Sequence, residues 1–169
     1  MCRKITRLAM LASLLFISSC VPTSSDISAE ARQYVGLHEY NDRKEIKNLV
    51  GVDPVRIEWC AAFVNAVLDL QNIRGSESVS DAPLMARSFL KWGKKVEGQP
   101  AKGDIVIFPR GNKNWEGHVG FYIETILVNG KEKWVILGGN QDNTVNYATY
   151  SPDSALGIRR YKPAQKVKP

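Results

Sequence analysis

The spacing of the hydrophobic residues changes once along this chain of 169 residues, near Lys102. From about Asp26 to Trp92, apolar residues recur at helical spacing, whereas after Lys102 they alternate with polar residues, as in half-buried strands. Asn129-Gly130 separates two of the alternating segments and is typical of the tight turn of a β-hairpin. Helices followed by hairpin-connected strands predict one α+β domain, with an antiparallel sheet of about five strands.

The boundaries of the expected elements follow from the same patterns. Asp42 and Glu45 resemble a capping box at the start of the second helix, and Gly51 is expected to end it. The third helix is apolar on almost every side, which is typical of a buried helix. We expect helices at 27–37, 42–50, 60–70 and 82–92, and strands at 104–108, 118–128, 131–138, 144–150 and 157–161.

The first nineteen residues have the composition of an export signal. Three basic residues precede an apolar stretch at 8–17, which is too short to span a membrane. Ile17-Ser18-Ser19-Cys20 resembles the lipobox of bacterial lipoproteins, which implies that Cys20 becomes acylated and anchors the protein in the membrane. Ordinary secretory cleavage and an uncleaved short anchor are the alternatives. Val21 in place of an aspartate favours the periplasmic face of the outer membrane, by analogy with enteric lipoproteins.

These signals divide the chain into a signal peptide (1–19), a lipidated cysteine with a short linker (20–28), a globular domain (29–162) and a basic tail (163–169). Without the signal peptide, which holds three basic and no acidic residues, the formal charge falls from +6 to +3. No nucleic-acid-binding motif accompanies this modest charge, so we expect no nucleic-acid partner.

Cys60 is the only cysteine of the expected globular domain. Of the three cysteines, Cys2 lies in the signal peptide and Cys20 in the lipobox, so Cys60 has no disulfide partner. It opens the apolar helix, and a helix start favours the thiolate and offers free N–H groups to a developing oxyanion. Cys60 is therefore a candidate nucleophile. The alternative is a buried cysteine that acts as a small hydrophobic residue.

His118 follows a glycine at the start of an expected strand. Alternation places it on one face of the strand with Gly120 and Tyr122, and we expect the missing side chain of Gly120 to let the helix of Cys60 approach the imidazole. His118 is a candidate general base and acid; the alternative is a half-buried histidine with a backbone partner. His38 is expected in the first helix, with a structural role.

Asn140 is expected at the end of the neighbouring hairpin strand, where its amide would orient the imidazole of His118. The neighbours Gln141 and Asp142 could fill this role instead, and Gly-Gly-Asn is also ordinary turn chemistry. No paired cysteine or histidine spacing accompanies these residues, so we expect no metal. Phosphate-binding glycine motifs and a Gly-x-Ser-x-Gly elbow are absent from the sequence, and we expect no cofactor.

Five short blocks resemble, in this order, a CHAP-like subfamily of the NlpC/P60 cysteine peptidases, and the resemblance covers roughly 29–161. The blocks are WCAAFVN (59–65), ARSFLKWG (86–93), PAKGDIV (100–106), GHVGF (117–121) and GGNQ (138–141). The resemblance implies a papain-like α+β fold, with the cysteine at a helix start packed against the sheet. It also implies hydrolysis of peptidoglycan amide bonds, within stem peptides or between glycan and peptide, through a thioester. The implied catalytic residues are Cys60, His118 and Asn140, with Trp59, Glu58, Gly117 and Gln141 around the substrate and the oxyanion.

Glu58 departs from the family pattern, which often has a small or capping residue beside the tryptophan. A carboxylate there is expected to raise the pKa of the thiol unless the helix start or a basic neighbour such as Arg56 offsets it. Two other functions remain open. The protein could be a wall-binding or scaffolding lipoprotein without activity, or a transpeptidase that passes the acyl group from the thioester to an amine.

Overall fold

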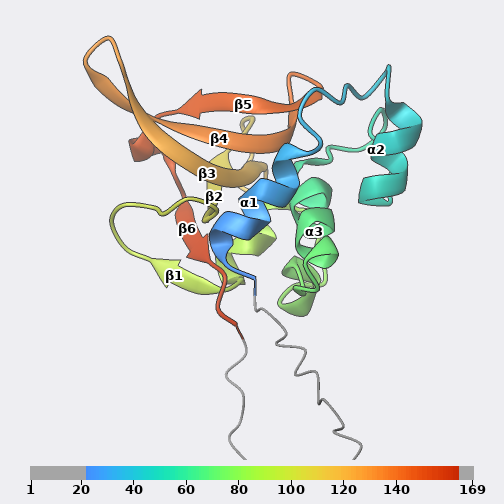
Figure 1. Cartoon of the computed structure of the whole chain (residues 1–169), viewed down its shortest axis with the longest axis horizontal. Helices are drawn as coiled ribbons and strands as arrows, with labels where there is room; N and C mark the ends of the chain where they lie inside the picture. The colour runs from blue at the N-terminus through green and yellow to red at the C-terminus, as the bar shows by residue number, and fades with distance from the viewer. Residues whose placement is uncertain (1–21, 164–169) are drawn as a thin grey trace, which may run out of the picture.

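A computed structural model describes residues 22–163 of the chain (Figure 1). The expected signal peptide, the expected lipidation site Cys20 and the tail from residue 164 onward lie outside the described residues. None of the helices in the described range is long and apolar enough to cross a membrane. The elements are α1 (Ser24–Arg32), α2 (Arg43–Val50), α3 (Cys60–Leu70), the 3-10 helices η1 (Ser76–Ser78), η2 (Ala86–Lys91) and η3 (Pro152–Ser154), and the strands β1 (Lys94–Val96), β2 (Ile105–Pro109), β3 (Gly117–Val128), β4 (Lys131–Gln141), β5 (Thr144–Tyr150) and β6 (Gly157–Arg160).

The strands form one six-stranded antiparallel sheet in the order β1-β6-β2-β3-β4-β5. The predicted α+β class is confirmed, and all five expected strands are present within a few residues of their predicted bounds. The sheet has one strand more than expected because β1 pairs with β6 at the edge. β1 has three residues, too few for an alternating pattern to reveal it.

The two faces of the sheet carry separate apolar clusters. Helices α1 and α3 lie over one face (Figure 1), where seven buried residues of α3 pack against Val119, Phe121 and Leu137. The opposite face carries a smaller cluster that includes Phe108 and Ile136. Successive side chains of β2, β3 and β4 point to opposite faces of the sheet, so these strands bury side chains on both faces, as expected for strands with few polar positions.

A glycine on β4 lets α3 approach the sheet. A Cβ added at Gly139 would lie 2.5 Å from the ring of Trp59 and 2.7 Å from the Cβ of Phe63. The expectation that Gly120 does this is wrong. A Cβ at Gly120 would meet Ile136 and the carbonyl of Leu137, which belong to the neighbouring strand and not to the helix.

The first helix is shorter than predicted. α1 begins within the expected linker, at Ser24, with a capping box between Thr23 and Asp26, and it ends at Arg32. The chain then turns and pairs with β5, through hydrogen bonds of Gly36 and Leu37 with Val145. His38 consequently lies after the helix, in an isolated β-bridge with Thr144, and its expected position in the helix is wrong. Tyr34 and Leu37 pack against the core from turns, whereas Val35 is exposed, and the spacing alone did not distinguish these turns from another helical turn.

The expected helix at 82–92 is also wrong, because only the 3-10 helix Ala86–Lys91 forms there. Asn65 of α3 holds the preceding segment as a loop: its amide donates to the carbonyl of Pro83 at 2.9 Å and accepts from the N–H of Ser76 at 2.8 Å. These tertiary hydrogen bonds override the helical pattern of the apolar residues.

In α2, Gly51 ends the helix at a φ of 75°, as expected. The carboxylate of Asp42 does not cap α2; it accepts from the N–H of His38 at 2.9 Å.

Candidate active site

Cys60 is the first residue of α3, and its side chain is free and 3% exposed. Trp59 at the N-cap makes no side-chain capping bond, so the first-turn N–H groups are not satisfied by a cap. Burial raises the pKa of the Cys60 thiol, and the charge of Arg110 and the N–H groups of Val119 and Ala61 act in the opposite direction. The helix start therefore faces the backbone of β3 directly after His118.

His118 lies near the start of β3, with 1% of its surface exposed. Its Nε2 lies 3.0 Å from the Oε1 of Gln141. The amide of Gln141 has a defined orientation, because its Nε2 donates to the carbonyls of Asn146 at 2.7 Å and Ile136 at 3.3 Å. Oε1 must then accept, so His118 carries its proton on Nε2. The Nδ1 keeps a lone pair, and this buried atom has no hydrogen-bond partner among the described residues.

Tyr150 completes the environment of the imidazole. Its ring stacks on His118 with 5.6 Å between the centroids, and its hydroxyl donates to the Oε1 of Gln141 at 3.0 Å. Burial raises the pKa of Tyr150 to about 12, which keeps this hydroxyl a donor at neutral pH. Burial, together with the charge of Arg110, lowers the pKa of His118 to about 4, although the bond to Gln141 opposes the shift. At neutral pH both the thiol and the imidazole are therefore uncharged.

Asn140 does not make the expected contact with the imidazole. Its Nδ2 donates to the Oε2 of Glu58 at 2.8 Å, whereas Gln141, the neighbour considered as an alternative, contacts His118. Asn140 lies at the end of β4 as expected. Its backbone has a φ of 56°, and the pairing between β4 and β5 is irregular at this position. Strand alternation therefore does not determine which of the two amides faces the histidine.

Arg110 links the acidic residue beside Cys60 to the end of β4. Its Nη1 donates to the carboxylate of Glu58 at 2.9 Å, and its Nη2 donates to the carbonyl of Asn140 at 2.7 Å. The basic neighbour suggested by the sequence, Arg56, instead pairs with Asp53 at 3.7 Å. Arg110 is the cation that offsets Glu58.

A cleft of about 290 Å³ opens beside Cys60. Trp115, which is 56% exposed, lies on the loop between β2 and β3, and Gly117 lies at the inner end of this loop. A Cβ at Gly117 would lie 3.1 Å from the side chain of Arg87, whose Nε donates to the carbonyl of Glu116 at 2.8 Å. The lining residues are Glu58, Cys60, Leu84, Met85, Ala86, Arg110, Gly111, Trp115, Glu116 and Gly117.

Sequence reasoning proposed Cys60, His118, Glu58 and Gln141 as site residues, but it did not propose Arg110 and Tyr150, which contact Glu58 and Gln141. Arg110 and Tyr150 both lie outside the five blocks. The sequence marks Arg110 only as the first residue of a loop, directly after Pro109. In the part of the chain that the structure describes, no group of three or more potential ligands could hold a metal ion.

Comparison of the chain with protein-family models, with curated proteins and with solved structures finds no match.

Proposed function

We propose that this protein is a cell-envelope cysteine hydrolase of the NlpC/P60 type, which cleaves amide bonds of peptidoglycan and is anchored to the outer membrane through acylated Cys20. One observation carries the proposal. The imidazole of His118 has Nε2 fixed by Gln141, while Nδ1 is buried without a partner, beside the strand residue whose N–H points at the thiol of Cys60. The fixed tautomer leaves the basic lone pair on Nδ1, and the next residue, Val119, contacts the thiol at the helix start. Cysteine acyl transfer requires such a base within reach of the thiol.

In the proposed reaction, Nδ1 of His118 takes the proton of the Cys60 thiol as the sulfur attacks the carbonyl carbon of the amide. The resulting oxyanion accepts hydrogen bonds from first-turn N–H groups of α3. The imidazolium then gives its proton to the departing amine, and the C–N bond breaks to leave a thioester on Cys60. A water molecule, deprotonated by His118, attacks the thioester and releases the acid, and the proton returns to the sulfur.

The neutral state of the pair decides how the thiol is activated. The pKa of Cys60 is raised and that of His118 is lowered, so a preformed thiolate–imidazolium pair is not the resting state. His118 acts as a general base during attack, and the cation of Arg110 and the N–H groups near the sulfur stabilise the developing negative charge. Gln141 is assigned the orienting role that the resemblance gave to Asn140, and Tyr150 holds Gln141 in place.

Digestion of purified sacculi tests the activity. The chain should release soluble muropeptides, and Cys60→Ala should abolish the release while its thermal unfolding stays close to that of the wild type. Digestion by Cys60→Ala at the wild-type rate would contradict the mechanism. Product masses with and without an added amine distinguish hydrolysis from the transpeptidase alternative, since only a transpeptidase joins the amine to the new carbonyl end.

One observation favours the alternative of a non-catalytic wall-binding lipoprotein: the thiol is 3% exposed and its pKa is raised. Labelling by a small thiol probe separates the two functions. Stoichiometric labelling of the folded chain near pH 8, slowed by His118→Ala, supports the hydrolase. Labelling that begins only when the chain unfolds, together with undiminished binding to sacculi, supports the wall-binding protein.

A further inference from the structure

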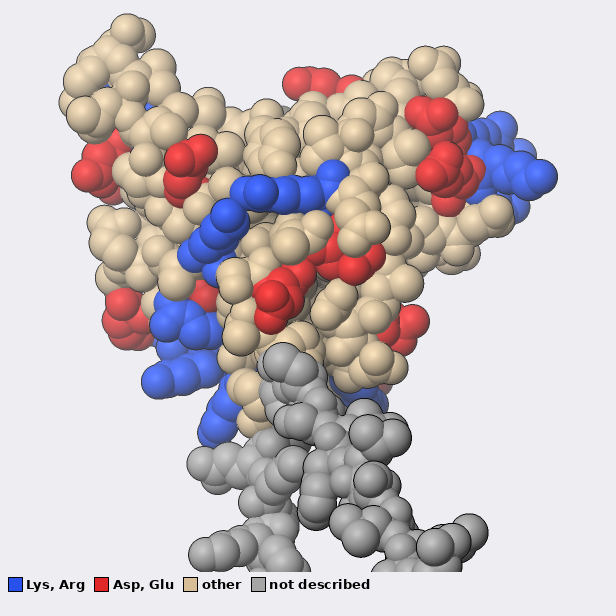
Figure 2. All heavy atoms as spheres, viewed as in Figure 1, with Lys and Arg blue, Asp and Glu red and all other residues tan. Residues whose placement is uncertain are grey.

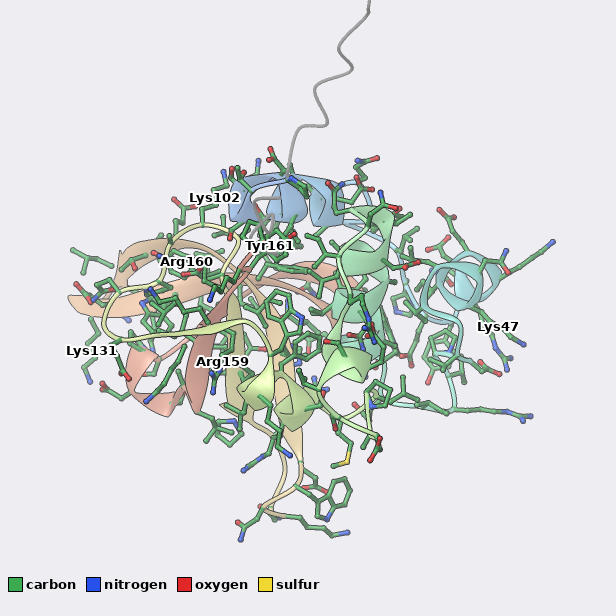
Figure 3. All side chains as sticks on the ribbon, turned by 90° about the horizontal axis from the view of Figure 1, so that it is seen from below. Lys47, Lys102, Lys131, Arg159, Arg160 and Tyr161 are labelled. Carbon is green, nitrogen blue, oxygen red and sulfur yellow. The ribbon has the colours of Figure 1, made fainter. Side chains whose placement is uncertain are left out.

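We propose that one end of the domain binds the anionic headgroups of a phospholipid bilayer, so that the cleft faces away from the membrane. This surface, the basic end, consists of Lys94, Lys102, Arg159, Arg160 and Lys162. In Figure 3, Lys102, Arg160 and Tyr161 lie close together near α1, in the upper half of the view. The inference goes beyond the proposed hydrolase. Only one of its arguments, the short chain between Cys20 and α1, rests on the proposed acylation of Cys20.

The basic end and the cleft lie at opposite ends of the central strand β2. Before β2, the N–H of Gly103 donates to the carbonyl of Tyr122 at 2.8 Å, and Ile105 pairs with Arg159 of β6. After β2, Pro109 leads directly into Arg110, which lines the cleft. A five-residue strand spans about 17 Å. A surface that contacts the basic end therefore leaves the cleft open on the far side.

The start of α1 lies on the same end. Gly103 has a φ of 85°, and a Cβ there would overlap the backbone of Ser24, so this glycine allows the helix start to rest on the turn before β2. Only Val21 separates Pro22, the first described residue, from Cys20. Each residue spans at most about 3.6 Å, so the two chain steps from Pro22 to an anchor at residue 20 can reach no further than about 7 Å. An acyl chain on Cys20 would consequently bring this end, and no other, to the bilayer.

The charge of the basic end fits an anionic surface. Lys94, Lys102 and Lys162 are exposed, and none has an acidic partner within ion-pair distance in residues 22–163. Arg160 is tied to buried Asp104 at 2.7 Å and contributes less. Figure 2 shows several Lys and Arg side chains at the lower left of the molecule, with Asp and Glu side chains beside them. Basic residues next to a bilayer are attracted to anionic headgroups, each strengthening binding by about fivefold.

Vesicle co-sedimentation tests the proposal with the chain from residue 20 onward, carrying Cys20→Ser so that no acyl group contributes. The chain should bind vesicles of phosphatidylcholine with about one third phosphatidylglycerol and not vesicles of phosphatidylcholine alone, and high salt should abolish binding. Lys94→Glu with Lys102→Glu should weaken binding at least about tenfold. The matched control, Lys47→Glu with Lys131→Glu, makes the same change in net charge on α2 and at the tip of the hairpin between β3 and β4, both away from β1 and β6 (Figure 1). It should change binding less than about twofold.

Three results would overturn the proposal: equal binding to neutral vesicles, equal loss in both double variants, or displacement of the chain by inorganic phosphate. Hydrogen exchange on the vesicle-bound chain tests the orientation. Exchange should slow at 94–102 and not at 110–117, and the reverse pattern would contradict it. All measurements are repeated with Cys60→Ala, so a failure of the proposed hydrolysis and a failure of membrane contact give separate results.

Discussion

The burial of a neutral His118 leads to a quantitative prediction about stability and pH. Its imidazole is 1% exposed, and burial lowers its pKa from 6.5 to about 4. Below pH 6.5 the unfolded chain binds a proton at this residue that the folded chain does not bind until about pH 4. The stability contributed by the neutral histidine is therefore present above pH 6.5 and is lost as the pH falls toward 4. Between pH 7 and pH 5 the loss is about 2 kcal/mol.

Urea unfolding of the wild type and of His118→Phe at pH 7, 6 and 5 measures this loss. Phenylalanine keeps a ring against Tyr150 but does not titrate. Other titrating groups are common to both chains, so they cancel in the difference between the two free energies of unfolding. The wild type should lose about 2 kcal/mol more than the variant from pH 7 to pH 5. Equal losses, or an imidazole NMR titration midpoint near 6.5, would refute a buried neutral histidine.

Three further substitutions test the neighbourhood of the site and the fold. Arg110→Gln should raise the pKa of the Cys60 thiol and slow its alkylation by iodoacetamide at pH 8, whereas Lys113→Gln on the same loop should not; faster alkylation of the arginine variant would contradict the assigned charge effect. Gly139→Ala should lower the free energy of unfolding by about 1–3 kcal/mol, because the new methyl group would meet the tryptophan ring of α3, and an unchanged melting temperature would exclude this close approach. Asp104→Ala should cost about 2–4 kcal/mol in urea unfolding, because its fully buried carboxylate accepts from a backbone N–H and from an arginine; a cost below about 0.5 kcal/mol would show that this pair behaves like an exposed one.

The sequence predicts the elements whose patterns are long and self-consistent. The apolar run after Cys60 forms α3, the Asn129-Gly130 hairpin joins β3 and β4, and Gly51 ends α2. In each case local propensity and burial favour the same structure. The helix predicted at 82–92 lacks this agreement, since Asn65 binds the loop before it and only a short 3-10 helix remains.

The contacts within the candidate site could be predicted only in part. Spacing made the thiol and the imidazole candidates, because a lone cysteine at a helix start and a histidine after a glycine are visible in the chain. The choice between Asn140 and Gln141 depends on a backbone irregularity at the end of β4, which no alternating pattern shows. Arg110 reaches Glu58 across 52 positions of sequence, and such a pairing exists only once the sheet has formed.

The structure changes the interpretation of Glu58, which the sequence analysis expects to oppose ionisation of the Cys60 thiol. Its carboxylate raises the pKa of the Cys60 thiol, but this is the smallest of the charge and hydrogen-bond effects there, and the side chain is 78% exposed, so water screens it. The same carboxylate binds Arg110, whose side chain is 35% exposed and whose charge lowers the thiol pKa by a larger effect. Removing the negative charge would therefore also remove one of the two hydrogen bonds that hold Arg110, the other being to the carbonyl of Asn140. An acidic residue beside the proposed nucleophile is consistent with thiolate formation because it positions Arg110 near the sulfur.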